Sequence, residues 1–220
     1  MVGKHVRIDA LDIDKDPPLL WDALGGNDGS INDRLQWWGL PDFQSPSDLR
    51  DLLQDVQSPA GCSVNVFRIL DGETAQNHTG VVAGMASFIG TQADHGTTEV
   101  GYVVHGPVMT RTPAATEAHY LLAKHAFETC RYRRYEWKCD GNNVKSRNAA
   151  QRLGFTFEGV FRQHRVTSKG NNRDTAWFSM LDEEWPKRKA AMEAWLDPSN
   201  FDANGQQLKS LQDHHQEQLE

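Results

Sequence analysis

Long hydrophobic runs are missing from this sequence. Nowhere among its 220 residues do apolar side chains continue for the ~18 positions that a membrane-crossing helix needs. The first sixteen residues, MVGKHVRIDALDIDKD, also lack the apolar centre of a secretory signal. We therefore expect no membrane span, no secretory leader and a cytoplasmic location.

Cysteine is also scarce, and basic residues are outnumbered by acidic ones, 23 to 30. The three cysteines are odd in number and lack the spacing of a disulfide framework or a metal site, which favours a reducing compartment. The histidines form no metal-binding pattern, so we expect no metal. A net charge of −7 and a pI near 5.7 argue against a broad nucleic-acid-binding surface, although Arg131, Arg133 and Arg134 form a local basic cluster. The expected partner is a small molecule or a protein.

The length suits one large domain with a substantial core. We expect this domain to span residues 1–197. Residues 198–220 are polar and rich in Gln, and they are expected to form a mobile tail.

Alternating apolar and polar positions predict a series of strands, listed here by residue number: 6–10, 63–70, 81–91, 98–105, 135–139, 155–166 and 175–181. Helical spacing and end signals predict helices at 19–24, 47–56, 112–129, 143–153 and 183–196. Ser47 is the expected N-cap of the second helix, and the polar link 71–80 joins two of the strands. Closely spaced early strands favour an antiparallel meander, and the β-α-β-α order that follows favours an α/β fold.

The stretch from Cys139 to Phe155, CDGNNVKSRNAAQRLGF, carries the strongest chemical signal. Asn143 suits a helix N-cap and Gly154 suits the C′ position. Asn143 and Ser146 are three residues apart, so they share one face of the first turn, where free N–H groups lie. They either face a ligand there or serve as a cap and a solvated hydroxyl.

A second helix start follows the strand at 98–105. Thr112 is a suitable N-cap, and Pro113 suits the first helical position. The amides of Ala114, Ala115 and Thr116, with Arg111 beside them, form a candidate pyrophosphate site. Two helix N-termini after neighbouring strands point to a ligand between the carboxyl ends of those strands.

Three stretches together resemble the GNAT superfamily of N-acetyltransferases, and within it the RimJ/RimL-like branch: GYVVHGPVMTRTPAATEA at 101–118, NNVKSRNAAQRLGFTFEG at 142–159, and RDTAWFSML at 173–181. The resemblance implies a mixed, strongly bent sheet with helices on both faces. It also implies that strands 98–105 and 135–139 splay apart to admit acetyl-CoA.

The resemblance assigns a cofactor site along the first of these strands and the helix after it. Main-chain groups of Val103, Val104 and His105 would pair with the pantetheine arm, and Arg111 to Thr116 would hold the pyrophosphate. Asn143 would orient the pantetheine or Ser146. The phosphate loop departs from the family pattern at Pro113, which has no amide hydrogen.

Acetyl transfer to an amine needs a base, a polarised carbonyl and a proton for the thiolate. Glu99 is the candidate base, Ser146 the candidate acid, and the Val104 amide the group that polarises the carbonyl. No covalent nucleophile is needed if both substrates bind together. Trp37, Trp38 and Tyr102 are candidate walls of the acceptor pocket.

Three functions stay open at this point. The first is acetylation of a protein N-terminus, the second is acetylation of a small amine such as a polyamine, an amino acid or an antibiotic, and the third is a non-catalytic CoA-binding module. Glu99 and Ser146 favour the enzymes, whereas Pro113 favours the module. We expect a monomer or a homodimer.

Overall fold

The computed structural model describes residues 1–70 and 80–218; residues 71–79 and 219–220 lie outside the described part. Most of the predicted polar link at 71–80 is therefore not described. No helix within these described ranges is both long and apolar enough to cross a membrane.

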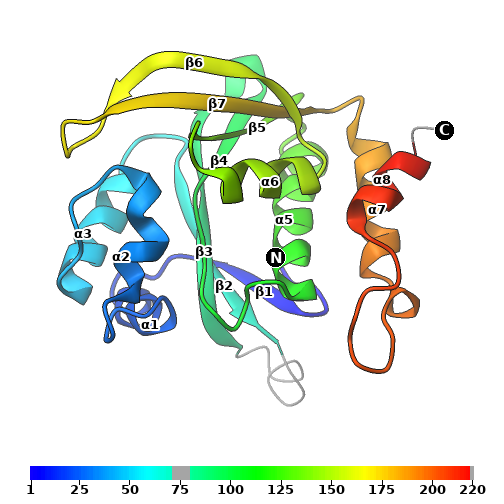
Figure 1. Ribbon diagram of the computed structural model, residues 1–220, viewed down its shortest axis with the longest axis horizontal. Coiled ribbons are helices and arrows are strands. Elements are labelled where there is room, and N and C mark those ends of the chain that lie inside the picture. Colours follow the sequence, from blue (N-terminus) through cyan, green and yellow to red (C-terminus); the bar gives the residue numbers. More distant parts are fainter. Residues whose placement is uncertain (71–79, 219–220) are drawn as a thin grey trace.

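A seven-stranded mixed sheet forms the centre of the molecule, in the order β1-β2-β3-β4-β5-β7-β6 (Figure 1). Its strands are β1 (Val6–Ala10), β2 (Ser63–Ile69), β3 (Val81–Gln92), β4 (Thr97–His105), β5 (Arg134–Asp140), β6 (Thr156–Val166) and β7 (Asn172–Leu181). β2, β3 and β4 form the predicted antiparallel meander, and β1 extends it on the outer edge of β2. β4 and β5 are parallel, and β7 lies antiparallel between β5 and β6. The predicted mixed α/β fold is confirmed.

Helices cover both faces of the sheet, as Figure 1 shows. One face carries α1 (Asp16–Ala23), α2 (Ser30–Leu35), η1 (Gln36–Trp38) and α3 (Pro46–Gln57). The other carries α5 (Pro113–Lys124), η3 (His125–Thr129), α6 (Val144–Arg152), α7 (Trp185–Leu196) and α8 (Leu211–Glu217). Each face has its own buried apolar cluster. We call them the α1–α3 face and the α5 face.

Strand alternation assigns side chains to the two faces. In β5, Tyr135, Trp137 and Cys139 are buried in the α5-face cluster, so Glu136 and Lys138 point to the α1–α3 face. In β4, Val100 belongs to the α5-face cluster. Its neighbour Glu99 pairs with Ile89 of β3, and Ile89 packs against the α1–α3 cluster. Because paired residues point to the same face, Glu99 lies on the α1–α3 face.

A β-bulge interrupts β4 just after this point. Ser87 pairs with Gly101 and Met85 with Val104, so two steps along β3 match three along β4. Tyr102 lies in the bulge with a left-handed φ of 49°. Because the extra residue shifts the alternation, Tyr102 joins Glu99 on the α1–α3 face.

Two sequence predictions need correction or extension. α3 begins at Pro46, and its N-cap is Ser45 in a capping box with Asp48, not Ser47, because Pro46 occupies the first helical position. The segment after residue 197 contains α8, whose Leu211 is fully buried in the α5-face cluster beside α7. The mobility of this tail and the span of the domain over residues 1–197 stay predictions.

Candidate active site

β4 and β5 separate partway along their length. They pair only from Thr97 with Arg134 to Val100 with Trp137. Beyond Val100, β4 keeps its partner β3 on one edge but has no strand partner on the β5 side within the described residues. Unpaired main-chain donors and acceptors therefore line one wall of an opening between the two strands. The splay predicted from the sequence is confirmed.

The loop before α5 lies at the end of β4. Met109 is fully buried and anchors the loop, while Arg111 is exposed and has a left-handed φ of 64°. Thr112 is the N-cap of α5, as predicted, but its hydroxyl donates to the Met109 carbonyl (2.7 Å) instead of capping the helix. Pro113 follows at the first helical position, so Ala114 presents the first free amide of the helix.

Thr116 is also predicted at the pyrophosphate site, but its hydroxyl is already hydrogen-bonded to another helix. The residue is only 2% exposed, and its hydroxyl accepts a hydrogen bond from Arg152 Nη1 (3.1 Å). It therefore links α5 to α6. Any phosphate contact by Thr116 would involve its amide alone.

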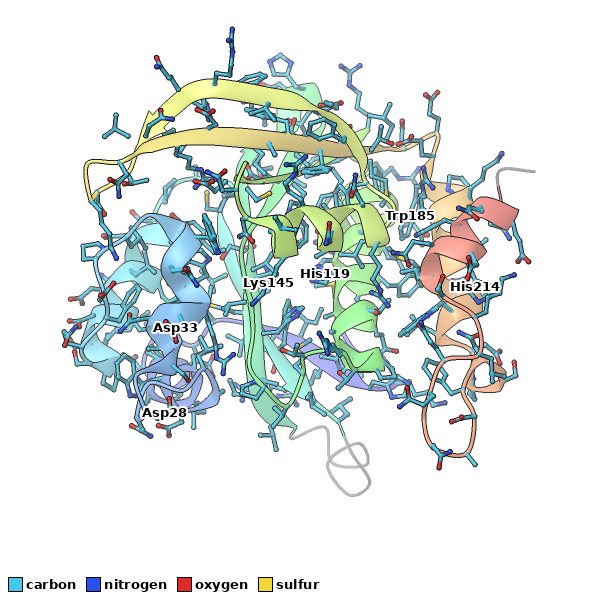
Figure 2. All side chains as sticks on the ribbon, in the orientation of Figure 1. Asp28, Asp33, His119, Lys145, Trp185 and His214 are labelled. Atoms are coloured by element: carbon cyan, nitrogen blue, oxygen red, sulfur yellow. The ribbon has the colours of Figure 1, made fainter. Side chains whose placement is uncertain are left out.

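The first turn of α6 lies beside β5 on the α5 face. Asn143 is the N-cap, as predicted, and its side-chain oxygen accepts from the Ser146 amide (3.1 Å). The Ser146 hydroxyl accepts from the indole N–H of Trp137 (2.9 Å). Because indole only donates, the Ser146 hydroxyl keeps its proton for a second partner. The Cys139 thiol is one such partner, since a hydrogen bond with Ser146 lowers its pKa against the larger opposing effect of burial. Figure 2 shows Lys145 extending from the same turn, away from the β6–β7 hairpin.

Glu99 lies on the other face of the sheet, in a chain of charged groups. Its carboxylate accepts from Lys138 Nζ (2.7 Å), and Lys138 also contacts Glu136 (2.6 Å). The side chains of all three are 14–17% exposed. Arg134 then pairs with Glu136 and, through both terminal nitrogens, with Glu158. Glu99 and Ser146 thus lie on opposite faces, on either side of the opening.

The two central carboxylates differ in proton affinity. Burial raises the pKa of Glu99, and the opposing effect of Lys138 does not cancel it. Burial also raises the pKa of Glu136, but hydrogen bonds from Lys138 and Arg134 outweigh it, so its pKa is lowered overall. Neighbouring acids with divergent pKa values are typical of a base beside a fixed charge.

Aromatic side chains border these carboxylates. Trp38 meets Tyr102 edge to face at 5.1 Å, whereas Trp37 is 37% exposed. Trp177 of β7 pairs with Lys138 across the strands, and the Lys138 ammonium lies 4.1 Å from the centre of its ring. Trp38 and Tyr102 thus come together as predicted, while Trp37 lies at the surface.

The tip of the β6–β7 hairpin closes this side of the molecule. Ser168 donates through its amide and its hydroxyl to the Gly39 carbonyl, and Lys169 pairs with Asp42 (2.7 Å). The hairpin is therefore fixed to the loop that follows η1. Figure 1 shows it arching across the top of the sheet toward α3.

Two buried donors on β7 lack partners among the described residues: Arg173 Nε and Trp177 Nε1. Both residues alternate with Phe178 and Ala176 of the α5-face cluster, so they point to the α1–α3 face. Buried donors are normally satisfied, which suggests that a ligand or water completes them.

The His105 side chain is enclosed on the α5 face, with its ring 5.3 Å from that of His119. Burial lowers the pKa of His105 to about 4. Only its main chain lies at the opening, and its contact with the pantetheine arm stays a prediction. No group of three potential metal ligands occurs in the described ranges.

Sequence comparison and structure comparison point to the same family. The model of the acetyltransferase (GNAT) domain matches residues 26–156. A GCN5-related N-acetyltransferase from Brucella melitensis is 39% identical, with 98% of this chain and 93% of that chain covered and a TM-score of 0.86. This chain belongs to the GNAT acetyltransferase family. It is an acyltransferase, and GNAT domains use acetyl-CoA as co-substrate.

Other solved structures share the GNAT fold. A probable GNAT acetyltransferase from Chromobacterium violaceum is 34% identical over 84% of this chain and 87% of that chain, with a TM-score of 0.74. An acetyltransferase from Salmonella typhimurium that modifies the N-terminal serine of ribosomal protein L7/L12 is 19% identical over 82% and 97%, with a TM-score of 0.66. That last likeness shows the fold alone. No curated protein sequence matches the chain.

The opening of this GNAT domain fits the co-substrate. Unpaired main-chain groups after Val100 suit an amide-bearing arm, and the free amide of Ala114 with exposed Arg111 suits a phosphate. Sequence reasoning missed Glu136 and Lys138. Their signal was the charged alternation Arg134, Glu136, Lys138 along β5, which marks one polar face of a strand.

Proposed function

We propose that this GNAT enzyme acetylates the N-terminal amine of a protein, in the manner of the RimJ/RimL-like branch, by direct transfer within a ternary complex. The observation that carries the proposal is the position of Glu99 and Ser146 on opposite faces of the β4–β5 opening. A thioester lying between them would have a base on the amine side and a hydroxyl on the sulfur side.

On the cofactor side, main-chain groups of Val103, Val104 and His105 would hold the pantetheine arm as a strand-like partner. Arg111, Thr112 and the amides of Ala114, Ala115 and Thr116 would hold the pyrophosphate. Pro113 contributes no amide there, so Arg111 has a larger share of the binding. Asn143 would fix Ser146 through the cap that it already makes.

On the acceptor side, Glu99 would take the proton of the amine. Its raised pKa brings its proton affinity closer to that of the group it must deprotonate, as efficient general bases require. The Ser146 hydroxyl would donate toward the departing thiolate. The Val104 amide would polarise the carbonyl that is attacked.

The unpartnered donors Arg173 Nε and Trp177 Nε1 favour a peptide acceptor. A peptide N-terminus carries an ammonium and, next to it, a carbonyl oxygen that accepts hydrogen bonds. The carboxylates of Glu99 and Glu136 suit the ammonium. The two donors are four residues apart on β7, so one of them suits this carbonyl and the other an acceptor atom further along the peptide. Trp38 and Tyr102 would flank the first side chain.

A second candidate is a small cationic amine. The Lys138 ammonium, held between two carboxylates and over the Trp177 ring, indicates that this cluster of side chains binds a cation through charge and an aromatic face. A polyamine would exploit that feature, but it has no acceptor atom for the two β7 donors.

A thiol-release assay separates these functions. Acetyl-CoA would be supplied with free peptides, the same peptides with blocked N-termini, and a set of polyamines, amino acids and aminoglycosides. We expect turnover on the free peptides and none on the blocked ones, with loss in Glu99→Gln. Turnover on polyamines alone would replace the proposal with the second candidate. Cytoplasmic location and a monomeric or homodimeric state stay predictions.

A further inference from the structure

One amine of the protein already occupies the acceptor side of the opening. Lys138 Nζ lies 2.7 Å from Glu99 and 2.6 Å from Glu136, and its side chain is only 17% exposed. The Trp177 ring supports the ammonium from a third side at 4.1 Å. These contacts, a candidate base, a second carboxylate and an aromatic face, are those proposed above for the amine of the acceptor.

The backbone of Lys138 lies where the two strands separate. Trp137 is the last β5 residue that pairs with β4, and its indole binds Ser146 on the α5 face. Lys138 is the next residue and points to the α1–α3 face. Its amine is therefore directed to the side of the opening from which an external amine would attack.

We propose that Lys138 is itself an acetyl acceptor, so that the enzyme acetylates this lysine when no external amine is present. The inference rests on the proposed function to the extent that acetyl-CoA lies in the β4–β5 opening. It does not depend on the identity of the external acceptor.

The reaction balances with acetyl-CoA as the acetyl donor. The Lys138 ammonium transfers one proton to Glu99, and the neutral Nζ attacks the thioester carbonyl carbon. A C–N bond forms and the C–S bond breaks. The nitrogen loses its second proton to solvent, and the thiolate leaves with the proton of the Ser146 hydroxyl, which solvent restores. Glu99 releases the first proton to solvent, so the products are acetyl-lysine, CoA thiol and, in net, one proton.

Acetylation would also change the site. Acetyl-lysine carries no charge, so Glu99 and Glu136 would lose the cation that they share. The buried carboxylates would then face each other across a neutral amide. An external cation would then find Glu99 and Glu136 without a competing ammonium. The acetylated Lys138 side chain would, however, fill more of the space beside them.

The test is intact-protein and peptide mass spectrometry after the full-length enzyme is incubated with acetyl-CoA and no acceptor. We expect one acetyl group, at Lys138, with a rate at least ~10²-fold above that of exposed Lys187 on α7, since a general base contributes about that much. Lys138→Arg keeps the positive charge and should abolish the modification. Lys187→Arg is the matched control and should not affect it.

Glu99→Gln should slow the modification of Lys138 at least tenfold while calorimetry shows unchanged CoA binding. An enzyme that acetylates peptides but leaves Lys138 unmodified would overturn this inference alone. Modification of Lys138 without turnover on any peptide would overturn the proposed acceptor and keep the inference. Failure to bind CoA would overturn both.

Discussion

Replacing Glu99 with Gln gives the sharpest test of the acid–base assignment. Gln has nearly the same size, and its carbonyl oxygen can still accept from Lys138, so the local packing should survive. What is lost is the base. General bases contribute about 10²–10⁴-fold to rate, which corresponds to about 2.7–5.5 kcal/mol of transition-state stabilisation. We expect kcat to fall by that factor.

The Michaelis constant for acetyl-CoA should change little in Glu99→Gln. Glu99 lies on the α1–α3 face, whereas the candidate cofactor groups lie on β4's free edge and the first turns of α5 and α6. A large rise in that constant would show that Glu99 shapes the cofactor site instead.

The pH profile gives a second readout with a definite sign. A base must be ionised, so kcat/KM should fall as the pH drops through the pKa of Glu99. Because burial raises that pKa, the fall should begin above the pH expected for an ordinary glutamate. The positive charge of Lys138 lowers this pKa. Lys138→Met should therefore move the acid limb of the profile, the range in which kcat/KM falls with falling pH, to higher pH by about 1–3 units, the effect of an adjacent charge.

The assay is steady-state thiol release from pH 5 to 9 for wild type, Glu99→Gln and Lys138→Met. Glu136→Gln is the matched control, because it removes a carboxylate from the same chain of charges. It should raise the Michaelis constant of the acceptor and keep the acid limb, moved slightly to lower pH because the charge of Glu136 contributes to the raised pKa of Glu99. The assignment of Glu99 as the base is refuted if Glu99→Gln keeps both its rate and its acid limb.

Three further changes test the rest of the site and its support. Ser146→Ala should lower kcat by about 10–100-fold, the worth of one hydrogen bond to a charged group, and stopped-flow thiol release should show the loss in the chemical step. Trp137→Phe removes the indole donor and reduces the ring in the core but leaves the Ser146 hydroxyl, so it should lower kcat less. Arg111→Ala should weaken CoA binding about tenfold in calorimetry, and an unchanged affinity would exclude it from the phosphate site. Gly154→Ala should lower thermal stability more than Gly170→Ala. Both positions have left-handed φ, but a Cβ at 154 would lie 2.9 Å from side chains of α7 and α8, and one at 170 meets nothing within 4 Å.

Local signals were enough to predict most of the fold. Alternation located the strands within a few residues, and the end signals at Thr112, Pro113, Asn143 and Gly154 located two helices correctly. These signals act over one turn or one strand. The misassigned N-cap at Ser47 has the same local origin, since the decisive residue is the neighbouring Pro46.

Contacts between distant strands could not be predicted in the same way. The pairing of Lys138 with Trp177 depends on β7 inserting between β5 and β6, and that insertion is a property of the whole sheet. The sequence showed a polar face on β5 but not what it faces. The tie between Thr116 and Arg152 likewise depends on the packing of α5 against α6.

The bulge at Tyr102 connects these local and global features. Without the extra residue, strict alternation from Glu99 would place residue 102 on the α5 face, because odd separations change sides. With it, Tyr102 joins Glu99 on the acceptor side, and Val103 turns toward the α5 face instead. The same irregularity lies at the first β4 positions that no longer pair with β5, so the bulge and the opening between the strands coincide. The left-handed φ of 49° at Tyr102 costs about 1–2 kcal/mol, which the packing of its ring against Trp38 and the α1–α3 cluster helps to offset.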